Sequence, residues 1–151
     1  MSNAPVYRAA TKADLAQIVS LELQLFGDHG YPDFFFRQCI DCWPNGLRLA
    51  TLDGRITGYI LITPSEQTDL AWILSLAVDT EFQGRGIGWG LVKDAIASLS
   101  EKMTRVKLTV DPNNPAVNLY LALGFVEQEI ESDYFGPGQA RIVMQLRRDR
   151  K

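Results

Sequence analysis

The sequence has few cysteine and histidine residues, and its basic side chains do not outnumber its acidic ones. It has two cysteines and one histidine among 151 residues, and its formal net charge is −3. A structural zinc site normally takes four ligands, so Cys39, Cys42 and His29 are too few and we expect no bound metal. Proteins that bind nucleic acid usually carry a basic surplus. The composition therefore predicts that nucleic acid is not a partner.

Long apolar runs are missing as well. No stretch approaches the roughly 20 apolar residues of a membrane-spanning helix, and the first residues lack the charged and apolar regions of a signal peptide. We expect no membrane partner and a cytoplasmic location. Residues 1–4 are equally compatible with disordered native sequence and with a vector-derived remnant. The basic end, residues 147–151, is expected to be a solvated tail.

Cys39 and Cys42 have the C-x-x-C spacing of redox-active cysteines. Such a pair is expected after a strand, where it opens a helix, but here it follows the aromatic residues 34–36. Free cysteine usually behaves as a small buried hydrophobe. We therefore favour packing over redox chemistry for both thiols.

The residues that are present predict one mixed domain over residues 1–151. Apolar residues make up 46% of the chain, and their spacing switches between the strand period and the helix period. Asp53-Gly54 is a strong hairpin signal, and Thr11 with Asp14 is typical of a helix start. The predicted order is β-α-α-β-β-β-α-β-α-β-β, with strands at residues 6–10, 47–52, 56–62, 70–78, 106–110, 126–134 and 141–146. Hairpins and one β-α-β crossover favour a mostly antiparallel sheet with a central parallel pair.

A glycine-rich run, residues 83–88, lies between a predicted buried strand and an amphipathic helix. The first N–H groups of a helix lack internal partners and carry partial positive charge. Glycines let a phosphate approach these groups, so the run predicts a pyrophosphate site beside Arg85. A plain turn is the alternative, although each glycine inside a helix costs about 1 kcal/mol. The run fits neither the P-loop nor the dinucleotide motif.

Two blocks of sequence resemble one family. Gln83-x-x-Gly86-x-Gly88 is similar to the Q/R-x-x-G-x-G/A signature of the GNAT (GCN5-related N-acetyltransferase) superfamily. Asn113-x-x-Ala116-x-x-Leu119-Tyr120, followed by Leu123-Gly124-Phe125, is similar to its N-x-x-A-x-x-L-Y…G-F block. The order and separation of the blocks also match. The resemblance, which extends to peptide N-terminal acetyltransferases of the ribosomal-protein-alanine type, implies acetyl-CoA (coenzyme A) as cofactor. It also implies an α/β (α+β) fold with a mixed sheet of about six to seven strands and about four helices.

The resemblance also implies roles for individual residues. Backbone groups that would pair with the pantetheine arm belong to Leu76, Ala77 and Val78. Backbone N–H groups that would hold the pyrophosphate belong to Gln83, Gly84, Arg85, Gly86, Ile87 and Gly88. Asn113 would contact the cofactor arm, and Tyr120 would lie near the thioester sulfur as general acid. The alternative for Tyr120 is a ring that packs in the core.

The residue that deprotonates the acceptor is not evident. A free amine is needed because ammonium groups are protonated below about pH 8 to 10.4. Related enzymes place glutamate on the strands predicted at residues 70–76 and 106–110, which contain no carboxylate here. Thr109 falls about where the ribosomal-protein-alanine enzymes have glutamate. The alternatives are a water held by Ser75 or by backbone carbonyls, and direct use of Glu66 or Asp69 at a strand entrance.

The acceptor is predicted to be a primary amine. Glu127, Glu129, Glu131 and Asp133 alternate on one predicted strand, either to attract a cation or as a solvated face. Candidate substrate residues are Phe26, Tyr31 and Tyr134. We expect a peptide or protein α-amine as acceptor. Polyamines or aminoglycosides are an alternative, as is a non-catalytic acyl-CoA-binding module. The chain is expected to be a monomer or a homodimer.

Overall fold

The computed structural model describes residues 4–148. The expectations for residues 1–3 and 149–151 fall outside the described residues. Arg147 belongs to the last strand and the Arg148 side chain donates to the Met103 carbonyl at 2.5 Å, so the expected solvated tail does not begin at residue 147. Strands are β1 (Val6–Ala9), β2 (Leu47–Leu52), β3 (Arg55–Pro64), β4 (Leu70–Val78), β5 (Arg105–Val110), β6 (Val126–Glu131) and β7 (Arg141–Arg147). Helices are α1 (Leu15–Phe26), α2 (Asp33–Cys42), α3 (Ile87–Ala97) and α4 (Ala116–Leu123), with short 3-10 turns η1 (Lys12–Asp14), η2 (Gly27–His29) and η3 (Thr80–Phe82).

The strands form a seven-stranded mixed sheet in the order β1-β2-β3-β4-β5-β7-β6. Strands β4 and β5 run parallel, and the pairs β1–β2, β2–β3, β5–β7 and β6–β7 are antiparallel. The predicted element order and the central parallel pair are thus confirmed. Among the described residues, one compact unit comprises the chain up to Ile62 together with Ser75–Ser98. The other comprises Thr63–Leu74 and the chain from Leu99 on.

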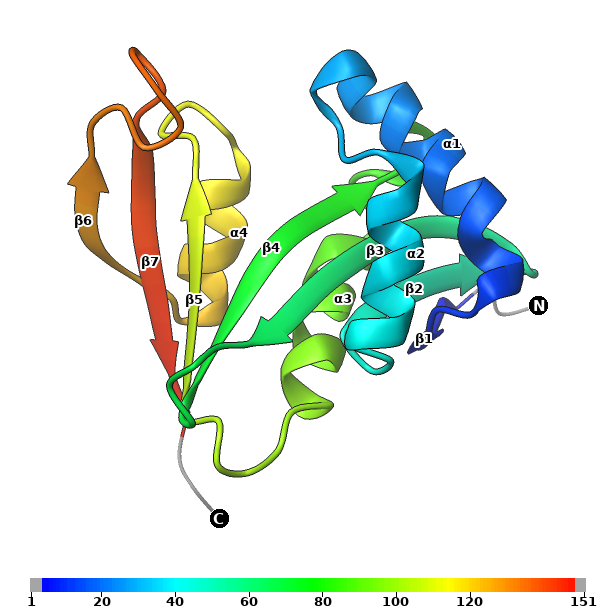
Figure 1. The fold of residues 1–151 in the computed structure, drawn as a ribbon, viewed down its shortest axis with the longest axis horizontal. Helices are drawn as coiled ribbons and strands as arrows, with labels where there is room; N and C mark the ends of the chain where they lie inside the picture. Colours follow the sequence, from blue (N-terminus) through cyan, green and yellow to red (C-terminus); the bar gives the residue numbers. More distant parts are fainter. Residues whose placement is uncertain (1–3, 149–151) are drawn as a thin grey trace. The chain divides into compact units, whose positions relative to one another are not determined.

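In the first unit, α1 and α2 pack on one face of the strands, and α3 covers the other (Figure 1). The core on the first face includes Ile18 and Leu21 from α1, Phe36 from α2, and Tyr59 from β3. On the opposite face, the Arg48 side chain of β2 donates to Asp94 of α3 at 2.5 Å. Because side chains alternate along a strand, β2 serves both layers.

The start of α1 is held by a carboxylate. The Asp14 carboxylate accepts the Thr11 N–H at 2.8 Å, as the capping pattern predicted. Arg8 donates to both Asp14 oxygens, at 2.8 and 2.9 Å. The hydrogen bond from Arg8 is the main reason that the pKa of Asp14 is lowered to about 2. These contacts fix the direction in which α1 leaves β1.

In the second unit, β7 lies between β5 and β6, and α4 ends at Gly124 in the left-handed conformation. The prediction of one strand over residues 126–134 was wrong, because β6 ends at Glu131 and Asp133 adopts a positive φ of 56°. The Asp133 carboxylate accepts the Gly138 N–H within this loop at 2.7 Å. A bulge between Glu127 and Glu129 also places these two side chains on opposite faces. The expected single acidic face therefore does not form.

Candidate active site

The glycine run follows a tightly tied corner after β4. The Asp79 N–H donates to the Thr57 carbonyl at 2.8 Å, and the Asp79 carboxylate accepts the Glu81 N–H at 3.0 Å. The Gln83 side chain donates back to the Val78 carbonyl at 3.2 Å. These bonds link β3, the end of β4 and η3, so the loop that follows has a defined starting point.

Two glycines in the loop need their special backbone conformation. Gly84 and Gly86 have φ values of +80° and +81°, and a Cβ added to either would meet no atom within 4 Å. Among the described residues, none accepts a hydrogen bond from the N–H of Gly84, Arg85 or Gly86. Gly86 precedes α3, whose first N–H groups also lack intrahelical partners. The loop therefore carries backbone donors that the described residues leave unpaired, and it is open where a Cβ of Gly84 or Gly86 would lie, which suits an anion.

Gly90 continues the glycine run into α3, but the reason for glycine at this position is different. A Cβ at Gly90 would lie 1.9 Å from the Tyr7 hydroxyl oxygen of β1. Gly90 is therefore a packing residue that lets α3 approach β1. The plain structural reading of the glycines is correct at this position, whereas Gly84 and Gly86 have no such neighbour.

Arginine side chains stand beside the loop. The guanidinium carbons of Arg55 and Arg85 lie 4.9 and 5.1 Å from the centroid of the Phe82 ring. Arg55 is also paired with Asp79 at 3.3 Å and Glu81 at 3.2 Å. Within residues 4–148, no carboxylate lies within ion-pair distance of Arg85. Arg85 is thus the cation available to a ligand. Arg55, which the sequence analysis did not single out, packs on the same Phe82 ring as Arg85.

The end of β4 carries the backbone predicted to bind the cofactor arm. Ala77 is buried, whereas Leu76 and Val78 are half-buried. A Cβ at Gly58 of β3 would lie 2.7 Å from the Ala77 carbonyl oxygen. Glycine at position 58 therefore permits the close approach of β3 to this part of β4.

Tyr120 lies in α4 of the second unit with 6% of its surface exposed. Its ring meets Phe125 edge-on, at a centroid distance of 5.6 Å, so the packing role is real. Burial raises the pKa of Tyr120 to about 12. Among the described residues, none forms a hydrogen bond with its hydroxyl. The phenol is therefore protonated at neutral pH and free to donate.

Asn113 is not used to cap α4. That role belongs to Asn114, whose side-chain oxygen accepts the Ala116 N–H at 2.9 Å. The Asn113 N–H donates to the Asp111 carboxylate at 2.9 Å, and its own amide group makes no hydrogen bond to the described residues. The Asn113 side chain, which is exposed, remains available to a ligand.

The aromatic residues predicted to contact the acceptor are partly accessible. Phe26 and Tyr31 of the first unit are 39% and 38% exposed, and Tyr31 stacks on Phe35 with ring centroids 4.4 Å apart. Tyr134 of the second unit is half-buried and meets Phe135 edge-on at 4.7 Å. Each unit therefore offers aromatic surface near a loop.

Comparison with known proteins decides the family. Residues 13–125 match the family model described as Acetyltransferase (GNAT) family. The chain belongs to the GNAT family. It is accordingly an N-acetyltransferase with acetyl-CoA as donor, and its fold is the GNAT fold.

Individual relatives agree with this assignment. The chain is 25% identical to an N-alpha-acetyltransferase from Sulfurisphaera tokodaii, over 91% of this chain and 89% of the relative. It is 29% identical to the N-alpha-acetyltransferase RimI of Mycobacterium tuberculosis, over 84% and 82% of the two chains. The crystal structure of the ribosomal-protein-S18-alanine N-acetyltransferase from Escherichia coli superposes with a TM-score of 0.79 at 24% identity. That superposition covers 95% of this chain and 94% of the other.

As a GNAT enzyme the chain needs a group that deprotonates its acceptor, and Asp69 does not suit this role. The Arg105 side chain donates to both Asp69 oxygens, at 2.9 and 3.0 Å. These hydrogen bonds lower the pKa of Asp69. A carboxylate held by a guanidinium is a weak base, so Asp69 serves to link the start of β4 to β5.

The structure brings forward a carboxylate that the sequence did not single out. Glu22 of α1 is buried, with 3% of its surface exposed, and accepts a hydrogen bond from the Tyr59 hydroxyl at 2.5 Å. Tyr59 in turn lies 2.8 Å from the Ser75 hydroxyl. The signal was present in the sequence, because Glu22 falls within the apolar stripe of its helix, where a carboxylate needs a special reason.

The two cysteines of this GNAT chain differ in exposure. Cys39 is buried and Cys42 exposed, and both are free thiols. Burial raises the pKa of Cys39 to about 11, which supports the packing interpretation for Cys39. The exposure of Cys42 contradicts that expectation for the second thiol. Within residues 4–148, no group of three or more histidine, cysteine or acidic side chains is placed to hold a metal. In the same range, no helix is long and apolar enough to cross a membrane.

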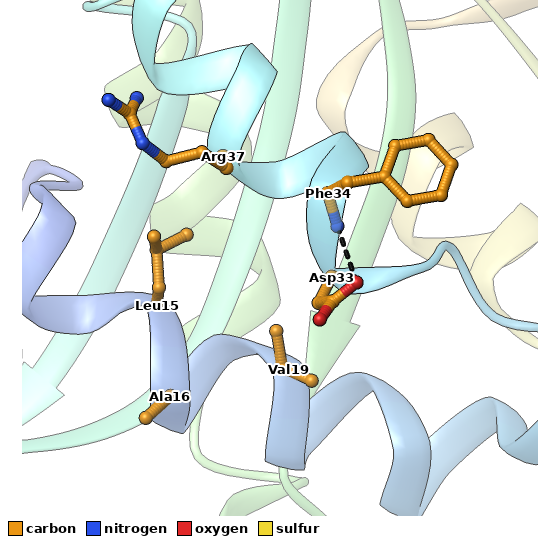
Figure 2. Close-up of a pocket in the computed structure, with 6 residues that line it drawn as sticks. All are labelled: Leu15, Ala16, Val19, Asp33, Phe34 and Arg37. Atoms are coloured by element: carbon orange, nitrogen blue, oxygen red, sulfur yellow. Dashed lines mark hydrogen bonds between the residues drawn. The ribbon is translucent and has the colours of Figure 1, made fainter.

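Figure 2 shows a pocket of about 370 Å³ between the beginnings of α1 and α2. Its lining residues are Leu15, Ala16, Val19, Asp33, Phe34 and Arg37. The Asp33 carboxylate there accepts the Phe34 N–H at 2.7 Å in the first turn of α2. None of the residues expected to bind the cofactor or the acceptor lines this pocket.

Proposed function

We propose that this enzyme acetylates the α-amino group of a peptide or protein. The glycine loop carries the cofactor part of the proposal, because the N–H groups of Gly84, Arg85 and Gly86 donate to none of the described residues. The acceptor class is supported by the relatives named N-alpha-acetyltransferase. It is also supported by the exposed aromatic side chains Phe26 and Tyr31. We further propose that the chain is one domain, because β4 contributes to both compact units, and that it is cytoplasmic.

The binding residues follow from the loop. Bound acetyl-CoA supplies the activated acetyl group. The backbone N–H groups of residues 83–88 and the Arg85 guanidinium are suited to its pyrophosphate. The backbone of residues 76–78 would align the pantetheine arm, with the Val78 N–H as donor to the developing oxyanion. The free amide of Asn113 would contact the same arm.

Tyr120 is proposed to protonate the departing thiolate. Its burial raises the pKa to about 12, so the hydroxyl keeps its proton until a base forms beside it. The absence of a hydrogen-bond partner among the described residues leaves this proton uncommitted. The edge-on contact with Phe125 fixes the ring, and the same side chain can therefore serve both packing and proton donation.

The experiment combines thermal melting with an acceptor panel. Saturating acetyl-CoA should raise the melting temperature, because a ligand at 100 times its Kd stabilises the folded state by about 2.7 kcal/mol. Release of free thiol should then be followed with peptides, polyamines and aminoglycosides. Transfer to peptide α-amines is expected. Transfer to polyamines alone would refute the peptide acceptor, and no melting shift at millimolar acetyl-CoA would refute the cofactor site.

A further inference from the structure

Glu22 is an unusual residue for its place in the fold. It projects from α1 into the core that contains Ile18, Leu21 and Phe36. Among residues 4–148, no lysine, arginine or histidine lies within ion-pair distance of it. Burying a carboxylate without a cation is unfavourable unless hydrogen bonds compensate. An apolar residue would avoid this cost, so the charge itself needs an explanation.

Hydrogen-bond donors meet both oxygens of Glu22. The Tyr59 hydroxyl donates to Oε1 at 2.5 Å, and the Tyr31 N–H donates to Oε2 at 2.8 Å. Two donors suit an ionised carboxylate, which only accepts hydrogen bonds. The other titratable group nearby is Cys39 of α2, which interacts with Tyr31. Burial raises the pKa of Tyr31, Tyr59 and Cys39, so these neighbours of Glu22 are neutral at pH 7.

The direction of the hydrogen bonds along this cluster follows if Glu22 is ionised and accepts from Tyr59. A phenol has one hydrogen, and Tyr59 uses it toward Glu22. The 2.8 Å contact between the hydroxyls of Tyr59 and Ser75 must therefore be a bond that Ser75 donates. The hydroxyl hydrogens of Ser75 and Tyr59 then both point toward Glu22. The lone pairs of Ser75 Oγ consequently remain free to accept a further proton donor.

Ser75 is the accessible end of the hydrogen-bonded series Ser75–Tyr59–Glu22. It is half-buried, whereas Tyr59 is fully buried and Glu22 nearly so. Ser75 also directly precedes Leu76, the first of the residues proposed to align the cofactor arm. Desolvation and the bond to Glu22 raise the pKa of Tyr59, so Tyr59 passes a proton on rather than losing it. The buried charge is thereby connected to the strand at which acyl transfer would occur.

We propose that Ser75, Tyr59 and Glu22 form a proton relay that deprotonates the acceptor amine. This inference rests on the proposed function. The ammonium group gives a proton to Ser75 Oγ, directly or through one water, as Ser75 passes its own to Tyr59 and Tyr59 passes its own to Glu22. The free amine and a neutral Glu22 result. The amine then forms the C–N bond as the C–S bond breaks. The nitrogen loses its second proton to solvent, the departing thiolate takes a proton from the proposed donor Tyr120, and solvent reprotonates Tyr120. Glu22 returns its proton to solvent after product release.

The competing explanation is a structural one. Glu22 links α1 to β3 and to the segment containing Tyr31, so the same bonds hold the fold together. A purely structural role predicts lower stability in variants, and equal loss of activity at every pH. A relay predicts a loss that depends on pH, because solvent supplies the free amine as the pH approaches the pKa of the acceptor.

The test compares Tyr59→Phe and Ser75→Ala with the matched controls Tyr7→Phe and Ser20→Ala. Tyr59→Phe leaves the bond between Glu22 and Tyr31 intact, and Ser75→Ala leaves all of Glu22's bonds intact. With a peptide α-amine of pKa near 8, wild-type kcat/KM should be level from about pH 6 to 8. Either variant should rise with pH, with a defect of about 30-fold at pH 6.5 that shrinks above pH 8. The double variant should lose no more kcat/KM than either single variant, because both substitutions interrupt the same proton relay.

The outcomes separate the relay from the proposed acceptor. If peptides fail and another amine is acetylated, the peptide acceptor is wrong, and the rise should end at the pKa of that amine instead. A folded Tyr59→Phe variant with the wild-type pH profile would overturn the relay. An activity-independent check is infrared spectroscopy of wild type minus Glu22→Gln at pH 7. The carboxylate band of an ionised Glu22 is expected, and a protonated carboxyl band would overturn the relay for any acceptor.

Discussion

The glycine loop and the Glu22 cluster belong to the same compact unit but are built in opposite ways. The loop is contiguous, exposed and made of backbone groups without partners among the described residues. The cluster is assembled from α1, β3 and β4, largely buried, and each polar group in it has a partner. The first arrangement is ready to receive a ligand, whereas the second is ready to move a proton.

The largest expected effect separates the loop from the rest of the unit. Gly86→Val places a β-branched residue in a left-handed conformation, beside the proposed phosphate site. We expect the Kd of acetyl-CoA, measured by calorimetry, to rise about 100-fold. This change equals about 2.7 kcal/mol of binding free energy. Gly54→Val is the control, because Gly54 has a φ of +80° and equally open surroundings in the β2–β3 hairpin. Equal binding loss in both variants would show that strain, not the loop, is responsible.

Tyr120→Phe tests the proton donor in the other unit. We expect kcat to fall about 100-fold, with the melting temperature and the shift by acetyl-CoA unchanged. The reason is that the hydroxyl has no hydrogen-bond partner among the described residues, whereas the ring keeps its contact with Phe125. Activity within a few-fold of wild type would assign Tyr120 to packing alone.

Glu22→Gln tests how far the cluster also stabilises the fold. The amide can accept from Tyr59 or from the Tyr31 N–H with its one oxygen, so one donor loses its acceptor. We expect the free energy of unfolding to fall by about 1 to 3 kcal/mol in urea denaturation. Glu101→Gln, at an exposed position, is the matched control. An intact melting shift by acetyl-CoA in Glu22→Gln would show that loop and cluster are independent.

The smallest expected effect concerns the start of the helix that carries Glu22. The pKa of Asp14 is lowered from 3.8 to about 2, chiefly by its hydrogen bond with Arg8. A lowered pKa stabilises the folded state above the unfolded value of 3.8, and this contribution disappears as the pH falls through about 2. Because Arg8 is partly exposed, we expect Asp14→Asn to lose about 1 kcal/mol at pH 7. Unfolding curves of Asp14→Asn and wild type, with Asp28→Asn as control, should converge near pH 2.

Local patterns were enough for most elements of the fold. The capping residues at Thr11 and Asp14, the hairpin at Asp53-Gly54 and the order of strands and helices were all confirmed. The prediction failed along β6, where a bulge and a positive φ at Asp133 interrupt the alternation. Neither leaves a hydrophobic pattern, because the residues of β6 are exposed. The need for glycine at position 90 also follows only from tertiary packing, because a Cβ there would meet the Tyr7 hydroxyl.

The sequence by itself determined the family, the donor and the position of the glycine loop. These properties depend on neighbouring residues and on backbone groups, which a short motif specifies directly. Only the tertiary structure decided which glycines face open space, which carboxylate is already bound to an arginine, and that Glu22 reaches Ser75 through Tyr59. Hydrogen-bond distances between side chains from separate elements depend on how the helices pack on the sheet, and no spacing along the chain encodes them.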